Sequence, residues 1–193
     1  MAKLYFRHSA MGGGKTASLL QVKYNYEQKG RWVFLIKPAI DTKGADTVVS
    51  RIGISAKVDT LVGPNDRIVD KLKAYKPDAI IVDEAQFLTP TQVDELFAIT
   101  KLYNIPVLCY GLRTDFQMKG FPGATRLLEI ADDIEELKTI CACGKKATQN
   151  LRKINETPVF EGEQIVIDNS DVVSYEAICG ECYLKLRRKY NGK

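Results

Sequence analysis

The chain has 193 residues, of which 45% are hydrophobic and 27% charged, and its formal net charge is +4 at pH 7. This composition is ordinary for a globular protein and excludes a disordered chain, while the length excludes two full catalytic domains of roughly 100–200 residues each. The basic cluster Lys185, Arg187, Arg188 and Lys189 is interpreted as a solvated helix face because no longer basic stripe accompanies it, so we expect no nucleic-acid partner.

The apolar runs are all shorter than the about 20 residues that a membrane-spanning helix requires, so we expect no membrane association. The first residues, Met1 to Arg7, lack a long apolar segment followed by a small-residue cleavage site, which favours a cytoplasmic protein. In that reducing compartment, five cysteines favour a metal site over a disulfide framework.

Short apolar runs alternate with helix-like stretches over the first two-thirds of the chain. This pattern predicts an α/β fold with a doubly wound, mostly parallel sheet. The predicted strands are 2–8, 31–37, 78–82, 105–110 and 134–138, and the predicted helices are 15–29, 65–76, 90–103 and 123–131. The expected helix boundaries are marked by Pro64-Asn65-Asp66 and Thr89-Pro90 at two starts, and by Gly30 and Asn104 at two ends.

From Thr139 onward the sequence changes to cysteine pairs, glycine-containing turns and a short β-like run, Gln164 to Ile167. A segment of this size holds too small a core to be stable alone, which is the situation that a bound metal commonly remedies. We therefore place a domain boundary near residue 138, between an ATP-binding α/β domain (1–138) and a small zinc-binding domain (139–193).

A phosphate-binding motif follows the first predicted strand. The segment Ser9-Ala10-Met11-Gly12-Gly13-Gly14-Lys15-Thr16 matches the P-loop pattern G-x-x-x-x-G-K-[ST], except that serine stands at the first glycine. Consecutive glycines let backbone N–H groups turn toward phosphate oxygens, Lys15 supplies positive charge and Thr16 offers a hydroxyl to Mg²⁺. A flexible glycine turn is the alternative, and Lys-Thr at the required spacing disfavours it. The motif predicts ATP and Mg²⁺ as ligands.

A pair of acids ends the buried strand run Ala79 to Val82, in the segment Asp83-Glu84-Ala85-Gln86-Phe87. Because the carboxyl ends of parallel strands line the ligand crevice, both acids are expected to face the phosphates. Asp83 is the expected Mg²⁺ partner. Glu84 can either accept a proton from a substrate hydroxyl or orient a water for hydrolysis, and this motif alone leaves both open.

Four cysteines form two close pairs, Cys141-Ala142-Cys143 and Cys179-Gly180-Glu181-Cys182. Two turns that each carry two thiolates can close a tetrahedral structural zinc site. Chance clustering of small buried cysteines is the alternative. The fifth cysteine, Cys109, is expected in the core, and the single histidine, His8, is interpreted as structural.

Taken together, these motifs resemble the type II thymidine kinases, whose P-loop domain carries a zinc-clipped lasso domain. The resemblance rests on Met11 within the P-loop, the acidic motif from Asp83, the stretch Gly111 to Gln117 and the order of the four cysteines. It implies a P-loop NTPase (RecA-like) fold with a zinc-ribbon-like lasso, and transfer of a phosphoryl group from ATP to the 5′-hydroxyl of thymidine and of deoxyuridine, in nucleotide salvage for DNA synthesis. It also implies a homotetramer and feedback inhibition by thymidine triphosphate.

The resemblance also implies roles for individual residues. Glu84 would be the general base, and ATP would be bound by residues 9–16 with Asp83 and Gln86. The thymine would be contacted by Met11, Phe87, Leu112, Phe116 and Tyr175, and the zinc by Cys141, Cys143, Cys179 and Cys182.

Two departures from the family pattern concern loops. The lasso glycine pair is replaced in the segment Ile167-Asp168-Asn169-Ser170, and the usual Asp-x-Arg reads Asp41-Thr42-Lys43, so that either Lys43 or Arg51 is the expected cation near the phosphates. Two hypotheses of other classes remain open from the sequence. They are a DNA-dependent P-loop ATPase with a structural zinc module, and a nucleotide-binding regulatory protein without chemistry.

Overall fold

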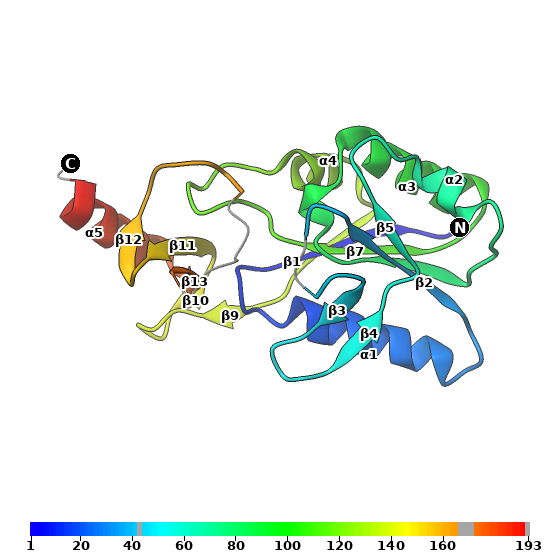
Figure 1. Ribbon diagram of the computed structural model, residues 1–193, viewed down its shortest axis with the longest axis horizontal. Coiled ribbons are helices and arrows are strands. Elements are labelled where there is room, and N and C mark those ends of the chain that lie inside the picture. Colours follow the sequence, from blue (N-terminus) through cyan, green and yellow to red (C-terminus); the bar gives the residue numbers. More distant parts are fainter. Residues whose placement is uncertain (42–43, 166–171, 192–193) are drawn as a thin grey trace.

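The computed structural model describes residues 1–41, 44–165 and 172–191. The molecule is elongated, with an α/β part at one end and a smaller part, rich in β-strands and ending in a helix, at the other (Figure 1). The predicted lasso segment from Ile167 to Ser170, and Thr42 and Lys43, lie outside the described residues.

The α/β part is built on one six-stranded sheet in which every pair of neighbouring strands is parallel, in the order β5-β2-β6-β7-β1-β8. Parallel neighbours need crossover connections, and helices supply most of these. The strands are β1 (Leu4–His8), β2 (Val33–Pro38), β5 (Thr60–Val62), β6 (Ala79–Val82), β7 (Val107–Gly111) and β8 (Asp133–Glu136).

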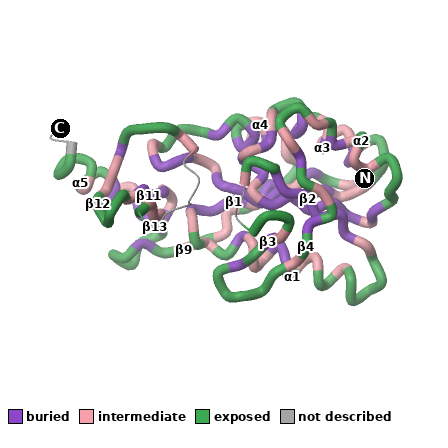
Figure 2. Tube along the Cα trace, viewed as in Figure 1, coloured by how far each residue is buried: buried purple, intermediate pink, exposed green. Residues whose placement is uncertain are grey.

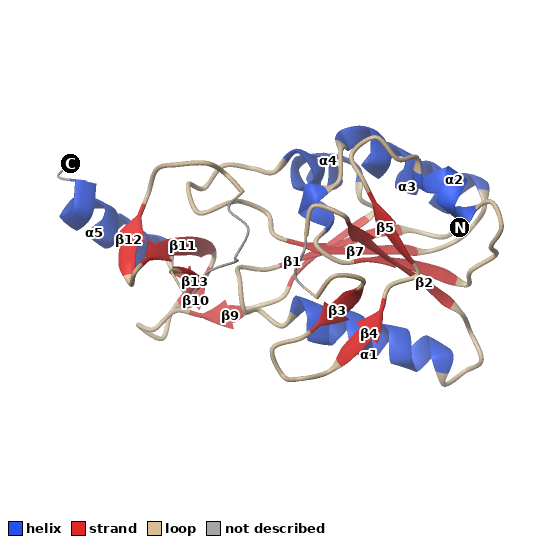
Figure 3. Ribbon diagram, in the orientation of Figure 1, coloured by secondary structure: helices blue, strands red, loops and turns tan. Residues whose placement is uncertain are grey.

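Helices and a hairpin cover both faces of this sheet (Figure 3). Helix α1 (Lys15–Glu27) and the hairpin β3 (Thr47–Val49) and β4 (Ser55–Lys57) cover one face. Helices α2 (Ile68–Leu72), α3 (Pro90–Leu102) and α4 (Pro122–Ile130) cover the other. Every residue of β2, β6 and β7 is buried, as expected for strands with both faces covered (Figure 2). The predicted doubly wound α/β fold is confirmed.

Local sequence signals set the ends of the longer helices. Thr89 and Gln92 form a capping box at the start of α3, with Pro90 in the first turn. Asn104 and Gly30 adopt left-handed backbone conformations, with φ of 56° and 67°, just beyond the ends of α3 and α1. Asparagine and glycine tolerate that conformation best, so the predicted stop signals are confirmed.

Helix α2 is much shorter than the predicted helix 65–76. The carboxylate of Asp66 accepts a hydrogen bond from the backbone N–H of Gly63 (3.0 Å), which holds residues 63–66 in a turn. The backbone N–H of Ile68 is bonded to Glu95 of α3 instead of to a capping residue (2.7 Å). The predicted start at residue 65 was therefore wrong, because these side chains stabilise a turn there.

The described residues of the C-terminal part form two small antiparallel sheets. Strands β9 (Thr139–Ile140) and β10 (Lys146–Ala147) form a hairpin, and β11 (Gln149–Ile154) lies between β12 (Thr157–Val159) and β13 (Val173–Ile178). Helix α5 (Gly180–Asn191) ends the described chain. A separate cluster of buried side chains lies here: Cys141, Ala147, Leu151, Phe160, Ile178, Cys179 and Tyr183.

The β-like run Gln164 to Ile167 is not a strand at its first two residues. Gln164 instead donates a side-chain hydrogen bond to Asp115 (3.0 Å), and its carbonyl accepts one from Arg152 (3.0 Å). These bonds replace the strand pairing that the apolar pattern suggested, and the prediction was wrong for Gln164 and Ile165. Val166 and Ile167 lie outside the described residues.

Gly123 allows the first turn of α4 to pack against the backbone of residues 85–88, which follow the acidic pair. A Cβ at this position would lie 2.5 Å from the carbonyl oxygen of Leu88 and 2.8 Å from that of Ala85. Both atoms belong to the backbone, so a side chain requires the turn to move. Gly123→Ala is expected to lower the free energy of unfolding by about 1–3 kcal/mol, the usual cost of overpacking, measured by urea denaturation.

Gly63→Ala is the matched control. A Cβ at Gly63 would meet its nearest neighbour, the Asp66 carboxylate, at 3.6 Å, which is ordinary contact. Its free energy of unfolding should stay within about 0.5 kcal/mol of the parent value. Equal stability of the two variants would contradict the tight packing inferred at α4.

Candidate active site

The P-loop connects β1 to α1 and has the backbone conformation that its glycines allow. Gly12 and Gly14 have φ of 74° and 76°, in the left-handed region that side chains disfavour. A Cβ at Gly13 would lie 2.5 Å from the Ser9 hydroxyl oxygen. The serine at the first P-loop position thus fills the space beside Gly13, and the loop keeps its turn without a glycine there.

Lys15 is buried at the start of α1. Its ammonium donates hydrogen bonds to the Ser9 hydroxyl (3.2 Å) and the Ala10 carbonyl (3.5 Å). Burial lowers the pKa of Lys15, and the nearby carboxylates of Glu84 and Asp83 act in the opposite direction. The lysine of the P-loop and the acids of β6 therefore share one electrostatic environment.

The acidic pair stands at the carboxyl end of β6. Asp83 is buried, and desolvation together with the negative charge of Glu84 raises its pKa. The Asp83 carboxylate accepts a hydrogen bond from the backbone N–H of Glu84 (3.0 Å). A carboxylate so placed is stabilised by a cation, and the hydroxyl and carboxylate oxygens of Thr16 and Asp83 are ligand types that Mg²⁺ prefers. These donors fit a Mg²⁺ site.

Glu84 has a strained backbone. Its φ and ψ of 48° and 40° place a residue with a long side chain in the left-handed region, at the start of the short 3₁₀ helix η1 (Ala85–Phe87). Such outliers cost on the order of 1–3 kcal/mol and cluster at functional sites. The side-chain amide of Gln86 donates a hydrogen bond to the Glu84 carboxylate (2.6 Å), and its oxygen accepts one from the backbone N–H of Leu112 (3.0 Å). Gln86 thereby ties Glu84 to the end of β7.

One cavity of about 570 Å³ contains most of the predicted site residues. Its volume is within the range of ligand sites, roughly 300–1,000 Å³. The polar members of its lining include Lys15, Asp83 and Glu84. The predicted nucleoside-binding residues all line it as well: Met11, Phe87, Leu112, Phe116 and Tyr175. The remaining predicted ATP-binding residues that line the cavity are Gly12, Gly13, Gly14, Thr16 and Gln86. Two predicted ATP-binding residues, Ser9 and Ala10, are buried and do not line it.

The hairpin β3–β4 brings a cation to the P-loop. The Arg51 guanidinium lies 3.1 Å from the position that a Cβ would take at Gly12, and Arg51 lines the cavity. Of the two expected cations, Lys43 lies outside the described residues. Lys37, at the end of β2, is a lining residue that the sequence did not single out; it is buried and pairs with Asp41 (3.1 Å).

Two other polar residues missed by sequence reasoning come from β11. The side-chain oxygen of Asn150 accepts a hydrogen bond from the backbone N–H of Met11 (2.8 Å), and its NH₂ group donates to the carbonyl of Thr114 (2.9 Å). Asn150 thus joins the P-loop, the loop after β7 and the C-terminal part. Arg152, also buried, contacts Phe116 and Tyr175. No local pattern marks either residue, because each acts on partners far away in the sequence.

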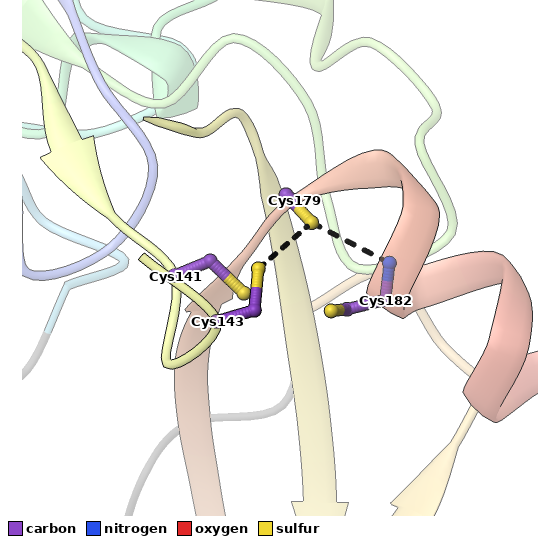
Figure 4. Close-up of side chains that lie close together, drawn as sticks. All are labelled: Cys141, Cys143, Cys179 and Cys182. Atoms are coloured by element: carbon purple, nitrogen blue, oxygen red, sulfur yellow. Dashed lines mark hydrogen bonds between the residues drawn. The ribbon is translucent and has the colours of Figure 1, made fainter. Parts of the chain in front are cut away.

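The four paired cysteines converge between the β9–β10 turn and the start of α5 (Figure 4). Their sulfur atoms all lie within 4.8 Å of one another, and those of Cys143 and Cys179 are 3.6 Å apart. Zinc–sulfur bonds of about 2.3 Å place tetrahedral ligands about 3.8 Å apart, so the set fits zinc. Backbone N–H groups of Cys143 and Cys179 lower the pKa of Cys141, as hydrogen bonds to a thiolate do. Cys109 is buried in the main core, as predicted.

His8 lies at the end of β1, where burial lowers its pKa, and its ring is tilted against Phe6.

Among the described residues, no helix has the length and apolar character needed to cross a membrane.

A family model described as "Thymidine kinase" matches residues 2–183. A thymidine kinase of Legionella pneumophila (strain Lens) is 47% identical over 93% of this chain and 88% of its own length. The thymidine kinase of Chromobacterium violaceum is 44% identical over 95% of this chain and 98% of its own length. That of Coxiella burnetii is 46% identical over 93% of this chain and 93% of its own length. The match to the solved structure of AMPPCP-bound DnaA from Aquifex aeolicus covers 71% of this chain and 40% of the DnaA chain. Its TM-score of 0.39 and identity of 18% are too low for the two sites to be compared. The chain belongs to the thymidine kinase family.

Proposed function

We propose that this protein transfers the γ-phosphoryl group of ATP to the 5′-hydroxyl of thymidine, and of deoxyuridine, with Glu84 as general base. The observation that carries the proposal is the single cavity that Lys15 and Glu84 line together with apolar and aromatic side chains. A site suited to phosphates and a surface suited to a flat base therefore lie in the same cavity, so that one nucleoside and the ATP phosphates could bind side by side. Membership of the family supports the same substrate and disfavours the DNA-dependent ATPase and the regulatory protein.

The ATP phosphates are bound by the P-loop N–H groups and Lys15, at the N-terminus of α1. Thr16 and Asp83 would hold Mg²⁺, which would supply positive charge to offset the negative charge of the ATP phosphates. Arg51 is proposed as the additional cation, because its guanidinium lies beside Gly12 at the mouth of the P-loop. Catalysis is then chiefly positioning and charge stabilisation.

Glu84 accepts the proton of the 5′-hydroxyl while the hydroxyl oxygen attacks the γ-phosphorus of ATP. A phosphorus–oxygen bond to the nucleoside forms, the bond to the β-phosphate breaks, and ADP leaves. The hydrogen bond from Gln86 orients the Glu84 carboxylate, and Glu84, whose backbone is left-handed, lines the cavity. The aromatic and apolar side chains Phe87, Phe116 and Leu112 are proposed to hold the base.

The four-cysteine set is proposed to bind one structural zinc, which would fix the start of α5 to the β9–β10 turn. Residues 139–193 are proposed as a lasso domain that covers the nucleoside. We further propose a cytoplasmic homotetramer for this chain, as the family resemblance implies.

Replacing Glu84 with glutamine removes the proton acceptor and keeps an oxygen that can accept the Gln86 hydrogen bond. The turnover number should fall at least about a hundredfold, the scale of general-base catalysis, while the Kd for ATP stays within about twofold. Steady-state kinetics with thymidine and isothermal titration with ATP measure the two quantities.

Glu129→Gln is the matched control, because Glu129 is an exposed residue of α4 that pairs with Arg126 away from the cavity. Its turnover should equal that of the parent. A Glu84→Gln variant with nearly normal turnover would remove Glu84 from the role of base.

The protein purified without chelators should contain about one zinc per chain, measured by mass spectrometry of the metal. Cys182→Ser should lower this content severalfold, because a hydroxyl is a poor replacement for a thiolate on zinc. The variant should also bind thymidine more weakly, because α5 holds the loop of Phe116 through the Tyr183 hydroxyl (2.7 Å to the Phe116 carbonyl).

Cys109→Ala is the control for this experiment, since Cys109 is buried in the core of the α/β part. It should retain the full zinc content. Less than half an equivalent of zinc in the parent protein, or unchanged zinc in Cys182→Ser, would count against the site.

A further inference from the structure

A buried arginine stands behind the proposed nucleoside pocket. Arg152 is only 3% exposed and lies in β11, the central strand of the C-terminal three-stranded sheet. It does not line the cavity, yet two residues that do, Phe116 and Tyr175, are its immediate neighbours. Burying a guanidinium is costly unless its donors are bonded, so its contacts define what it does.

Each of the three guanidinium nitrogens of Arg152 donates a hydrogen bond. Its Nε donates to the Tyr175 hydroxyl (2.8 Å), and its two terminal nitrogens donate to the backbone carbonyls of Glu163 (2.8 Å) and Gln164 (3.0 Å). No carboxylate lies within ion-pair distance of Arg152 in the described ranges 1–41, 44–165 and 172–191. The group therefore binds two segments of chain, one in β13 and one just after β12.

The face of the same guanidinium packs on an aromatic ring. Its carbon atom lies 3.7 Å from the centre of the Phe116 ring, a close cation–π contact. Phe116 belongs to the loop that follows β7, so it comes from the α/β part. Arg152 thus contacts three separate segments at once, and each contributes a lining residue to the cavity: Phe116, Gln164 and Tyr175.

We propose that Arg152 is the positioning residue for the nucleoside-binding wall, setting the positions of the Phe116 ring, the Tyr175 hydroxyl and the backbone at Gln164 at the same time. This inference rests on the proposed function and adds a residue that acts through others. Because its partners lie at the base end of the cavity, and Lys15 and the P-loop lie at the phosphate end, Arg152 governs affinity for thymidine and leaves affinity for ATP unchanged.

Arg152→Lys tests this inference directly. Lysine keeps the positive charge but lacks the planar fork that bonds two carbonyls and a hydroxyl while stacking on a ring. The KM for thymidine should rise at least tenfold, and the KM for ATP should stay within twofold. A variant that is merely less stable would lower the active fraction without separating the two KM values, so thermal unfolding is measured alongside.

Lys153→Met is the matched control. Lys153 is the next residue of β11, on its other face, where it pairs with Glu176 (2.7 Å). Both of its KM values should stay within twofold of the parent. Should Arg152→Lys fail to fold, Tyr175→Phe removes only the hydroxyl that accepts the Nε hydrogen bond, and it should raise the KM for thymidine severalfold without changing that for ATP.

The outcomes separate this inference from the proposed function. A parent protein that does not phosphorylate thymidine would overturn the proposed function. A parent that does, together with a folded Arg152→Lys variant whose KM for thymidine is unchanged or whose two KM values rise equally, would overturn the role of Arg152 alone. In the absence of a folded Arg152→Lys variant, an unchanged KM for thymidine in Tyr175→Phe would overturn it.

Discussion

Parallel pairing in the central sheet is the constraint on which the site depends. Because β1, β6 and β7 run in the same direction and are neighbours, their carboxyl ends meet at one edge. The P-loop, the acidic pair and the loop of Leu112 leave the sheet at that edge, so glycine-rich backbone, carboxylates and apolar side chains converge there without any long-range signal in the sequence. Lys15 and Asp83 are both buried at this edge. Solvent therefore screens the electrostatic interaction between them only weakly.

The C-terminal part completes the cavity by contacts to loops and not by extending the sheet. Asn150 bonds the backbone of the P-loop and of the loop after β7, and Arg152 packs on Phe116 of that same loop. Tyr183, next to Cys182, donates to the carbonyl of Phe116. The cysteine cluster is therefore linked through α5 to the loop of Phe116, which lines the cavity. The proposed zinc would thus have a physical route to substrate affinity without any place in the chemistry.

The sequence predicted what depends on local pattern. Fully apolar runs such as Ala79 to Val82 became the central strands, and the P-loop and paired cysteines folded into the arrangements that their spacing indicated. Most of the failures come from competition by partners distant in the chain, and at helix α2 the local turn between Gly63 and Asp66 contributes as well. Helix α2 starts late because Glu95 takes the N–H of Ile68, and Gln164 leaves its expected strand for Asp115 and Arg152. Asn150 and Arg152 were missed for the same reason, since their polar side chains are explained only by the groups that they bond once the chain has folded.

The strain at Glu84 is best understood together with its neighbours. A glycine would adopt φ of 48° at less cost, yet a carboxylate occupies the position, and it is held by Gln86 across to Leu112. Gly111 and Gly123 make room for this arrangement, because a Cβ at Gly111 would lie 2.7 Å from the Gln86 side-chain oxygen and one at Gly123 would press on the η1 backbone. Two close approaches and one unfavourable backbone conformation thus serve the orientation of a single side chain. A carboxylate needed only for solubility would not require them, and the proposed role as base accounts for all three.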